Sequence, residues 1–339
     1  MKHISTLYFF LMLGILLSCE TEIPFNGNET NPVLVVNCLA CTDSVIQATV
    51  SASRFFLSNE DEFPAVTDAT VALYVNGIFI ENLTNMGLGY YRSNYIPAEG
   101  DVVRLNVSAT GFEPVWAENA FPIATTGFQV DSTITKTDTI PLVNGNYYNY
   151  GGGGGGGDYG NPTWDTIGTT FSYIHEYKVR FSNPGGVPNY YRLVVHGQTV
   201  ANGYPLVNSY LNNFDDIVFG TKNNNLEGIF TESKIDRYNV FSDELIDGKT
   251  HTITFTYAQP FNTFIDSLYK SYTVGDERSV TIDLQSISKS YYLYLVSLKA
   301  LESSDPFMSE PVQIYTNING GLGIFGARTH QLRKFILPE

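Results

Sequence analysis

From residue 33 to residue 108, short runs of apolar and β-branched residues alternate with turn-forming residues. The Asn76-Gly77 pair separates two of these runs, and both residues tolerate the positive φ of a type I′ hairpin turn. Short runs at this spacing are typical of a β-sandwich. The 23 Tyr and 22 Phe residues agree, because aromatic side chains favour half-buried pleated strands. The runs expected to form strands here are 33–36, 45–51, 69–75, 78–83, 89–93 and 102–108.

The second half of the chain predicts another sheet system and one helix. Strand-like patterns return at 173–181, 190–196, 216–219 and 251–257. Between 284 and 302, apolar residues including Tyr291 and Leu295 recur near the 3.6-residue period of a helix, and Ser286 or Ser288 is available as the N-cap. The predicted fold class is therefore all-β, with two β-sandwich-like domains and one α-helix in the C-terminal half.

Composition divides the chain. Residues 131–170 are rich in Thr, Asn, Tyr and Gly, and 151–157 are seven consecutive glycines, which have no side chains to bury. The predicted segments are a signal peptide at 1–18, a flexible tether at 19–31, an N-terminal sandwich at 32–122, a linker or insertion at 123–172 and a C-terminal β domain at 173–339.

The N-terminus has the pattern of a secretory signal. Lys2 and His3 precede an apolar run at 7–17, which is shorter than the ~20 residues that span a bilayer as a helix. The run ends in Leu-Leu-Ser-Cys, and this tetrapeptide resembles a bacterial lipobox. The resemblance implies cleavage before Cys19 and lipid attachment to its sulfur, so we expect a membrane anchor.

Cys38-Leu39-Ala40-Cys41 is a C-x-x-C motif in a segment expected to connect two strands. Thioredoxin-type chemistry requires a helix after the motif, and no helical pattern follows it here. A zinc site would require a second pair of ligands, and none is visible in the sequence. In an oxidising compartment, a local disulfide between Cys38 and Cys41 is the first expectation and unpaired thiols the second.

The chemistry-bearing residues predict no catalytic site. The histidines His175, His196, His251 and His330 match no metal motif, so we expect neither metal nor cofactor. The acidic pairs at 215–216 and 243–244 are expected to lie in loops or at a helix start. A net charge of −15 disfavours nucleic acid as a partner.

The stretch 305–327 is the most specific in the chain. It reads as a proline-bounded loop, a strand and a glycine-rich turn into another strand. Its characteristic residues, expected to have a structural role, are Ser309, Glu310, Pro311, Asn317, Gly320, Gly321, Gly323, Phe325 and Gly326.

Together with the lipobox and the Pro-Val-Leu-Val-Val-Asn strand at 32–37, this stretch resembles the Bacteroidota lipoprotein family of domain of unknown function 4249. The segment 69–93 is also similar to transthyretin-like or immunoglobulin-like modules of secreted proteins. The family resemblance implies an outer-membrane lipoprotein, in a group whose members are often associated with TonB-dependent transporters. It implies no reaction and no catalytic residue.

These observations favour a non-enzymatic accessory or binding lipoprotein, anchored at the periplasmic or the outer face of the membrane, that works with a TonB-dependent transporter. Two alternatives stay open. One is a lipid-anchored hydrolase of glycans or peptides, which requires convergent carboxylates or a Ser/His pair. The other is a purely structural envelope lipoprotein.

Overall fold

The structure is a computed structural model. It describes residues 31–55, 63–136, 139–145, 164–201, 204–209, 214, 216–219, 237–264, 277–304 and 311–337. These residues form three β-sheets, one 3-10 turn and one α-helix, so the fold is all-β with a single helix, as predicted. No helix among them is long and apolar enough to cross a membrane.

The N-lobe is a sandwich of two sheets. Its outer sheet has the order β4-β3-β7-β8 and is formed by β3 (Thr70–Val75), β4 (Ile78–Asn82), β7 (Val102–Ser108) and β8 (Val115–Ala120). The facing strands are β1 (Leu34–Cys41), β2 (Gln47–Ala52), β5 (Thr84–Gly87) and β6 (Tyr90–Arg92). Alternate residues of β1, β3 and β7 are buried, because successive side chains of a strand point to opposite faces.

The C-lobe is a second sandwich. One of its sheets is formed by β9 (Thr126–Lys136), β10 (Ile140–Gly145), β11 (Trp164–Ser182) and β15 (Thr250–Phe264). The facing strands are β12 (Tyr190–Ala201), β13 (Tyr204–Ser209), β14 (Val240–Ser242) and β16 (Glu277–Ile287). Aromatic side chains fill the space between the sheets, with Tyr177 and Phe181 from β11 and Tyr191 from β12 almost fully buried.

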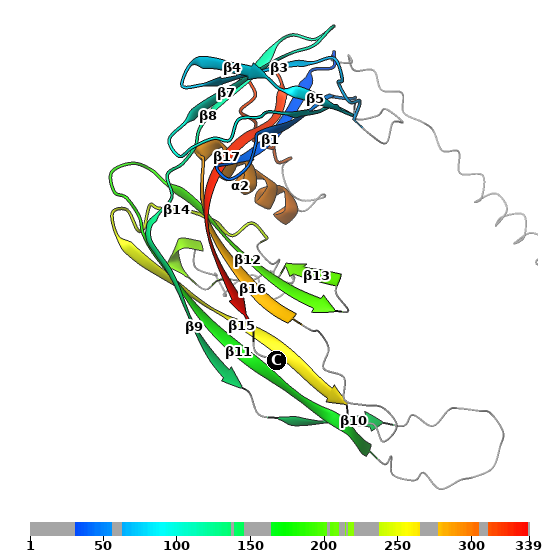
Figure 1. Cartoon of the computed structure of the whole chain (residues 1–339), viewed down its shortest axis with the longest axis vertical. Helices are drawn as coiled ribbons and strands as arrows, with labels where there is room; N and C mark the ends of the chain where they lie inside the picture. Colours follow the sequence, from blue (N-terminus) through cyan, green and yellow to red (C-terminus); the bar gives the residue numbers. More distant parts are fainter. Residues whose placement is uncertain are drawn as a thin grey trace, which may run out of the picture.

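The last strand, β17 (Leu322–Ile336), belongs to both lobes. Its first half pairs in parallel with β1, from Val35 opposite Leu322 to Cys41 opposite Arg328. Its second half pairs antiparallel with β16. One nine-stranded sheet therefore runs through the molecule in the order β13-β12-β16-β17-β1-β2-β6-β5, with β14 also pairing with β12, and Figure 1 shows β17 descending from the N-lobe into the C-lobe.

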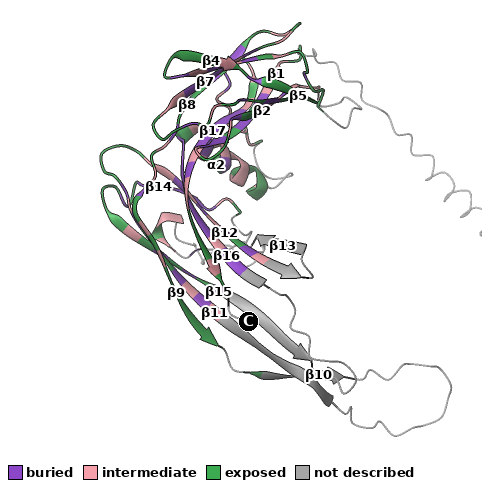
Figure 2. Ribbon diagram, viewed as in Figure 1, coloured by how far each residue is buried: buried purple, intermediate pink, exposed green. Residues whose placement is uncertain are grey.

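Burial follows this architecture. Figure 2 shows buried segments along β1, β17, β12 and β16, where the sheets face one another. Phe325 and Ala327 of β17 lie in the N-lobe core with Leu34 and Val36. The chain thus completes its first sandwich with residues from its C-terminal end.

Two local predictions are confirmed. Asn76 and Gly77 have φ of 51° and 81° and join β3 to β4. The helix α2 (Lys289–Ser303) begins after Ser288, whose hydroxyl accepts a hydrogen bond from the Tyr291 N–H. Residues 284–287, expected at the start of the helix, instead form the end of β16.

Three further local predictions differ from the structure. The expected linker at 123–172 contains β9, β10 and the start of β11, because pairing with β15 and with each other orders these polar segments. The segment 216–219 holds the 3-10 turn η1 (Ile217–Phe219) rather than a strand. The connection expected at 38–44 is part of β1 up to Cys41, since β17 supplies a pairing partner. The glycine run 151–157 lies outside the described residues.

Candidate functional site

Two adjoining hollows lie at the end of the C-lobe that carries the start of β12, and one of them extends to the residues that follow β8. The larger, of about 640 Å³, is lined by residues of 186–190 and 242–247 and by Tyr292. The other, of about 520 Å³, is lined by residues of 120–126, 184–190 and 286–289. Both are lined by Val187, Pro188 and Tyr190, so we treat them as one site and call it the tyrosine groove.

A pair of aromatic rings lies in the groove. Tyr190 opens β12 and Tyr292 lies in the first turn of α2, and their ring centroids are 4.7 Å apart. Ser288 fixes the start of the helix, because its hydroxyl accepts hydrogen bonds from the N–H groups of Tyr291, at 3.4 Å, and Ala327, at 3.1 Å. Burial raises the pKa of Tyr292, and the nearby Tyr190 and Glu244 raise it further. Tyr292 is therefore uncharged at neutral pH, and strand β12 and the capped start of α2 hold the ring pair in place.

One wall of the groove is built around a buried carboxylate. Asp243 accepts hydrogen bonds from the side-chain amides of Asn183, at 3.1 Å, and Asn189, at 2.9 Å. Asp247 accepts one from the Gly186 N–H at 3.0 Å. These contacts join the loop before β12 to the turn after β14, so the wall is preformed.

The rim of the groove is anionic. Glu244 and Asp247 are exposed beside the ring pair. An aromatic surface next to carboxylates can stack on a ligand while accepting its hydrogen bonds, and it also attracts cations. The groove is thus suited to a ligand rich in hydroxyl groups or carrying positive charge. The acidic pair 243–244 lies in a turn, as the sequence analysis expected.

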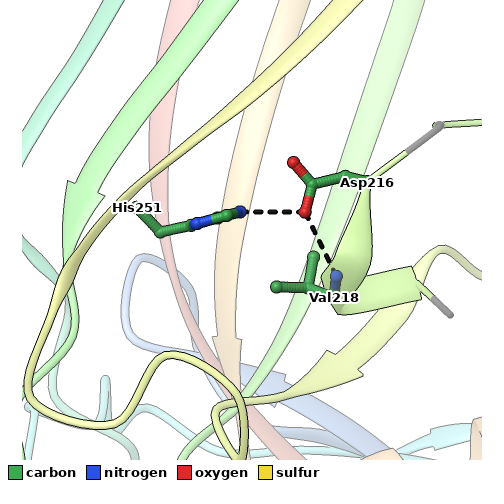
Figure 3. A network of polar contacts seen from close by, with 3 residues as sticks. All are labelled: Asp216, Val218 and His251. Carbon is green, nitrogen blue, oxygen red and sulfur yellow. Dashed lines mark hydrogen bonds and ion pairs between the residues drawn. The ribbon is translucent and has the colours of Figure 1, made fainter.

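Asp216 forms a hydrogen bond with a histidine. The His251 Nε2 lies 2.9 Å from Asp216 Oδ1, which also accepts the Val218 N–H at 3.1 Å (Figure 3). These contacts fasten η1 to β15. Asp215 lies outside the described residues, and the hydrolase alternative stays untested.

The two cysteines of the C-x-x-C motif are unbridged, which corrects the predicted disulfide. Both lie in β1, where residues three apart point to opposite faces of the sheet. Cys38 faces the N-lobe core, and burial raises the pKa of its thiol to about 12. Cys41 lies instead beside Asp43 and His330.

The described residues of the C-terminal motif hold β17 against its neighbours. The Asn317 side chain donates to the Phe325 carbonyl oxygen at 2.8 Å and accepts from the Phe325 N–H at 2.9 Å, as a strand partner would. Gly323 has φ of 106°, and a Cβ there would lie 2.1 Å from the Val36 carbonyl oxygen. A Cβ on Gly326 would lie 2.8 Å from a Leu39 methyl group and 3.0 Å from Tyr291. These contacts are packing contacts.

The remaining residues of the motif divide into two groups. Gly320 and Gly321 form the turn before β17, close to Pro114 and Val115, and Pro311 precedes it. Ser309, Glu310 and the expected lipid-bearing Cys19 lie outside the described residues.

Sequence reasoning did not find the groove or the grouping of Cys41 with Asp43 and His330. The only local signal for the groove is the Tyr190-Tyr191 pair, and a second tyrosine pair at 291–292 lies about one hundred positions later. Nothing in the linear sequence relates the two pairs.

Comparison with known proteins identified one family. A family model described as Domain of unknown function (DUF4249) matches residues 20–333. No curated protein matches the chain.

Proposed function

The chain belongs to the DUF4249 family, and we propose that it acts as a lipid-anchored accessory or binding lipoprotein of the outer membrane, without catalytic activity of its own. The observation that carries this proposal is the position of Cys19. It follows Ser18 at the end of the apolar run and precedes the first folded strand, which begins at Leu34. A lipid on Cys19 would place both lobes beside the membrane on a short tether.

The anchor has a direct test. We expect the wild-type chain to sediment with membranes and the Cys19→Ala variant to stay in the soluble fraction. Cys38→Ala is the matched control, because it alters another cysteine and should leave the protein in the membranes. Mass spectrometry of the N-terminal peptide should show Cys19 as the first residue with a diacylglyceryl adduct. An unmodified or uncleaved N-terminus would contradict the anchor.

The tyrosine groove is the contact surface that we propose. It combines the Tyr190 and Tyr292 rings, which pack against each other at a tilt of 30°, with the exposed carboxylates of Glu244 and Asp247. The hydrogen bonds around Asp243 preform its wall, so little conformational entropy is lost when a partner binds. Aromatic anchors in a preformed hollow are the usual source of binding energy.

We propose a TonB-dependent transporter as the partner. The tagged chain, purified from detergent-solubilised membranes, should recover such a transporter. The double variant Tyr190→Ser/Tyr292→Ser should lose it, whereas Tyr90→Ser, which alters an exposed tyrosine of the N-lobe, should keep it. Recovery of no transporter with the wild-type chain would contradict the partnership. Equal recovery with the double variant would place the contact elsewhere.

The non-catalytic role is tested separately. Purified chain incubated with envelope glycans and peptides should release no products above a buffer control. Hydrolysis that disappears in an Asp216→Asn variant would favour the hydrolase alternative instead.

A further inference from the structure

Cys41, Asp43 and His330 converge at the junction between the lobes. Cys41 ends β1, Asp43 lies in the following turn, and His330 lies on β17 two positions beyond Arg328, the pairing partner of Cys41. One ligating atom from each residue lies within 4.8 Å of the others. The His330 Nε2 is 3.0 Å from Asp43 Oδ2.

A buried carboxylate lies beside the second ring nitrogen of His330 and orients the ring. Its Nδ1 is 3.7 Å from Asp283 Oδ1, on the neighbouring strand β16. The side chain of Asp283 is only 8% exposed, and the Gln285 side-chain amide donates to its other oxygen at 2.6 Å. Asp283 Oδ1 itself accepts no hydrogen bond in the described structure. A proton on Nδ1 would point toward Asp283 and leave the lone pair of Nε2 directed at Asp43 and Cys41.

A carboxylate behind the outer nitrogen of a histidine is the arrangement that orients histidine ligands of metal ions. An ion pair between His330 and Asp43 alone would not explain why the buried Asp283 lies beside the other nitrogen of His330. It would also not explain why the Cys41 thiol lies within 4.8 Å of both side chains. Asp283 Oδ1 is buried without a hydrogen-bond partner among the described residues, and an imidazole bound to metal through Nε2 would present the Nδ1 proton to it.

We propose that Cys41, Asp43 and His330 bind a Zn²⁺ ion, with Asp283 positioning His330. Thiolate sulfur, imidazole nitrogen and carboxylate oxygen together form a ligand set that suits zinc, whereas Mg²⁺ and Ca²⁺ prefer oxygen ligands alone. In a tetrahedral zinc site, neighbouring ligand atoms lie about 3.3 to 3.6 Å apart. The three ligand atoms, which lie within 4.8 Å of one another, are already close to that spacing.

The site has room for a fourth ligand. Cys41 is buried, His330 is partly exposed and the side chain of Asp43 is 53% exposed, so the site opens to solvent at Asp43. When the sulfur binds zinc, the thiol proton passes to solvent. The ion then balances the charges of the Cys41 thiolate and the Asp43 carboxylate.

Zinc would have a mechanical consequence here. Cys41 and Asp43 belong to the N-lobe segment of the shared sheet, and Asp283 lies on β16 in the C-lobe. A metal bound across β1 and β17 would fasten the first strand to the last, at the point where β17 leaves one lobe and enters the other.

The test uses the full-length chain, purified with reductant, and Zn²⁺ alone as the probe. Titration calorimetry should show one equivalent of Zn²⁺ bound. Co²⁺ in its place should produce a near-ultraviolet band from a cobalt-thiolate bond, which reports Cys41 as a ligand. Asp43→Asn should weaken zinc binding at least about 100-fold, because losing even an outer-shell partner of a ligand costs up to about 100-fold. Because the Asp43 side chain is more than half exposed, this variant is expected to fold.

Further variants separate ligation from folding. Cys41→Ser should abolish the cobalt-thiolate band. Asp283→Asn, which keeps the shape of the side chain, should weaken binding about 10- to 100-fold while the band remains. His251→Gln, which removes another partly buried histidine, should bind zinc like the wild type.

Three results would overturn the proposal: no stoichiometric zinc bound by the wild-type chain, a cobalt complex without the thiolate band, or unchanged affinity in Asp43→Asn. Each is independent of whether Cys19 is lipidated or a transporter is recovered.

Discussion

Replacing Phe325 with alanine tests whether the last strand completes the first sandwich. Phe325 is 0% exposed and lies among Val36 of β1, Leu105 of β7 and Val115 of β8. A Phe→Ala change in a core costs about 3–5 kcal/mol, which combines the lost transfer energy of the ring with the cavity that it leaves. Because hydrogen-bonded ladders hold the surrounding strands, the core cannot close around the cavity, and we expect a loss of about 4 kcal/mol.

This loss is large beside the total stability of a protein, which is typically about 5–15 kcal/mol. Urea unfolding followed by circular dichroism measures it. Ile336→Ala is the matched control, because Ile336 is a large apolar residue at the end of the same strand but is 62% exposed. We expect that control to change the free energy of unfolding by less than about 0.5 kcal/mol. A loss below about 1 kcal/mol for Phe325→Ala, or equal losses for both variants, would refute the reasoning.

Three further predictions follow from local contacts. Asp101→Asn should make stability less dependent on pH in acid. Burial alone would raise the pKa of Asp101, but hydrogen bonds from the Tyr95 hydroxyl, the Ala98 N–H and the Asn76 side-chain amide lower it overall. Since the folded pKa lies below the unfolded value, the carboxylate stabilises the fold above the unfolded pKa, and this contribution is lost as the pH falls through the folded pKa. The urea midpoint should therefore fall more steeply between pH 7 and pH 2 for the wild type than for the variant. Parallel curves for the two proteins would contradict this. Ser288→Ala should cost about 1–2 kcal/mol in thermal or urea unfolding, because it removes the N-cap of α2 and leaves the buried Ala327 N–H without a partner, and Ser288→Thr should recover part of the loss. The Cys38 thiol, whose pKa burial raises to about 12, should react with a thiol reagent only after unfolding, and rapid labelling of the native protein at Cys38 would show that β1 is not packed as described.

Features that depend on neighbouring residues were predictable from the sequence. Asn76-Gly77 forms its hairpin because two adjacent residues take positive φ, and Ser288 caps α2 because its hydroxyl reaches an N–H three residues ahead. The all-β class followed in the same way, from apolar runs whose length and spacing suit strands. Each of these signals lies within a few residues of the structure that it specifies.

The polar strands of the C-lobe were harder to predict. Residues 126–136 carry many Thr and Ser side chains, and nine of the eleven positions in β9 are exposed. Only Phe128 and Val130 pack against the core, so what orders most of the strand is pairing with β11. Similarly, the C-x-x-C motif was expected in a connection because nothing nearby showed that β17 would extend β1 as far as Cys41.

The residues of the chain by themselves determined the apolar strands, the hairpin turn, the helix cap and the class of fold, since those depend on backbone preferences and on local periodicity. Only the tertiary structure decided that the C-terminal strand completes the N-terminal sandwich, that Tyr190 meets Tyr292, and that His330 reaches Cys41 and Asp43. The physical reason is register: a parallel pairing between β1 and β17 joins segments almost 290 positions apart, and its alignment depends on the packing of both lobes rather than on any pattern within either strand.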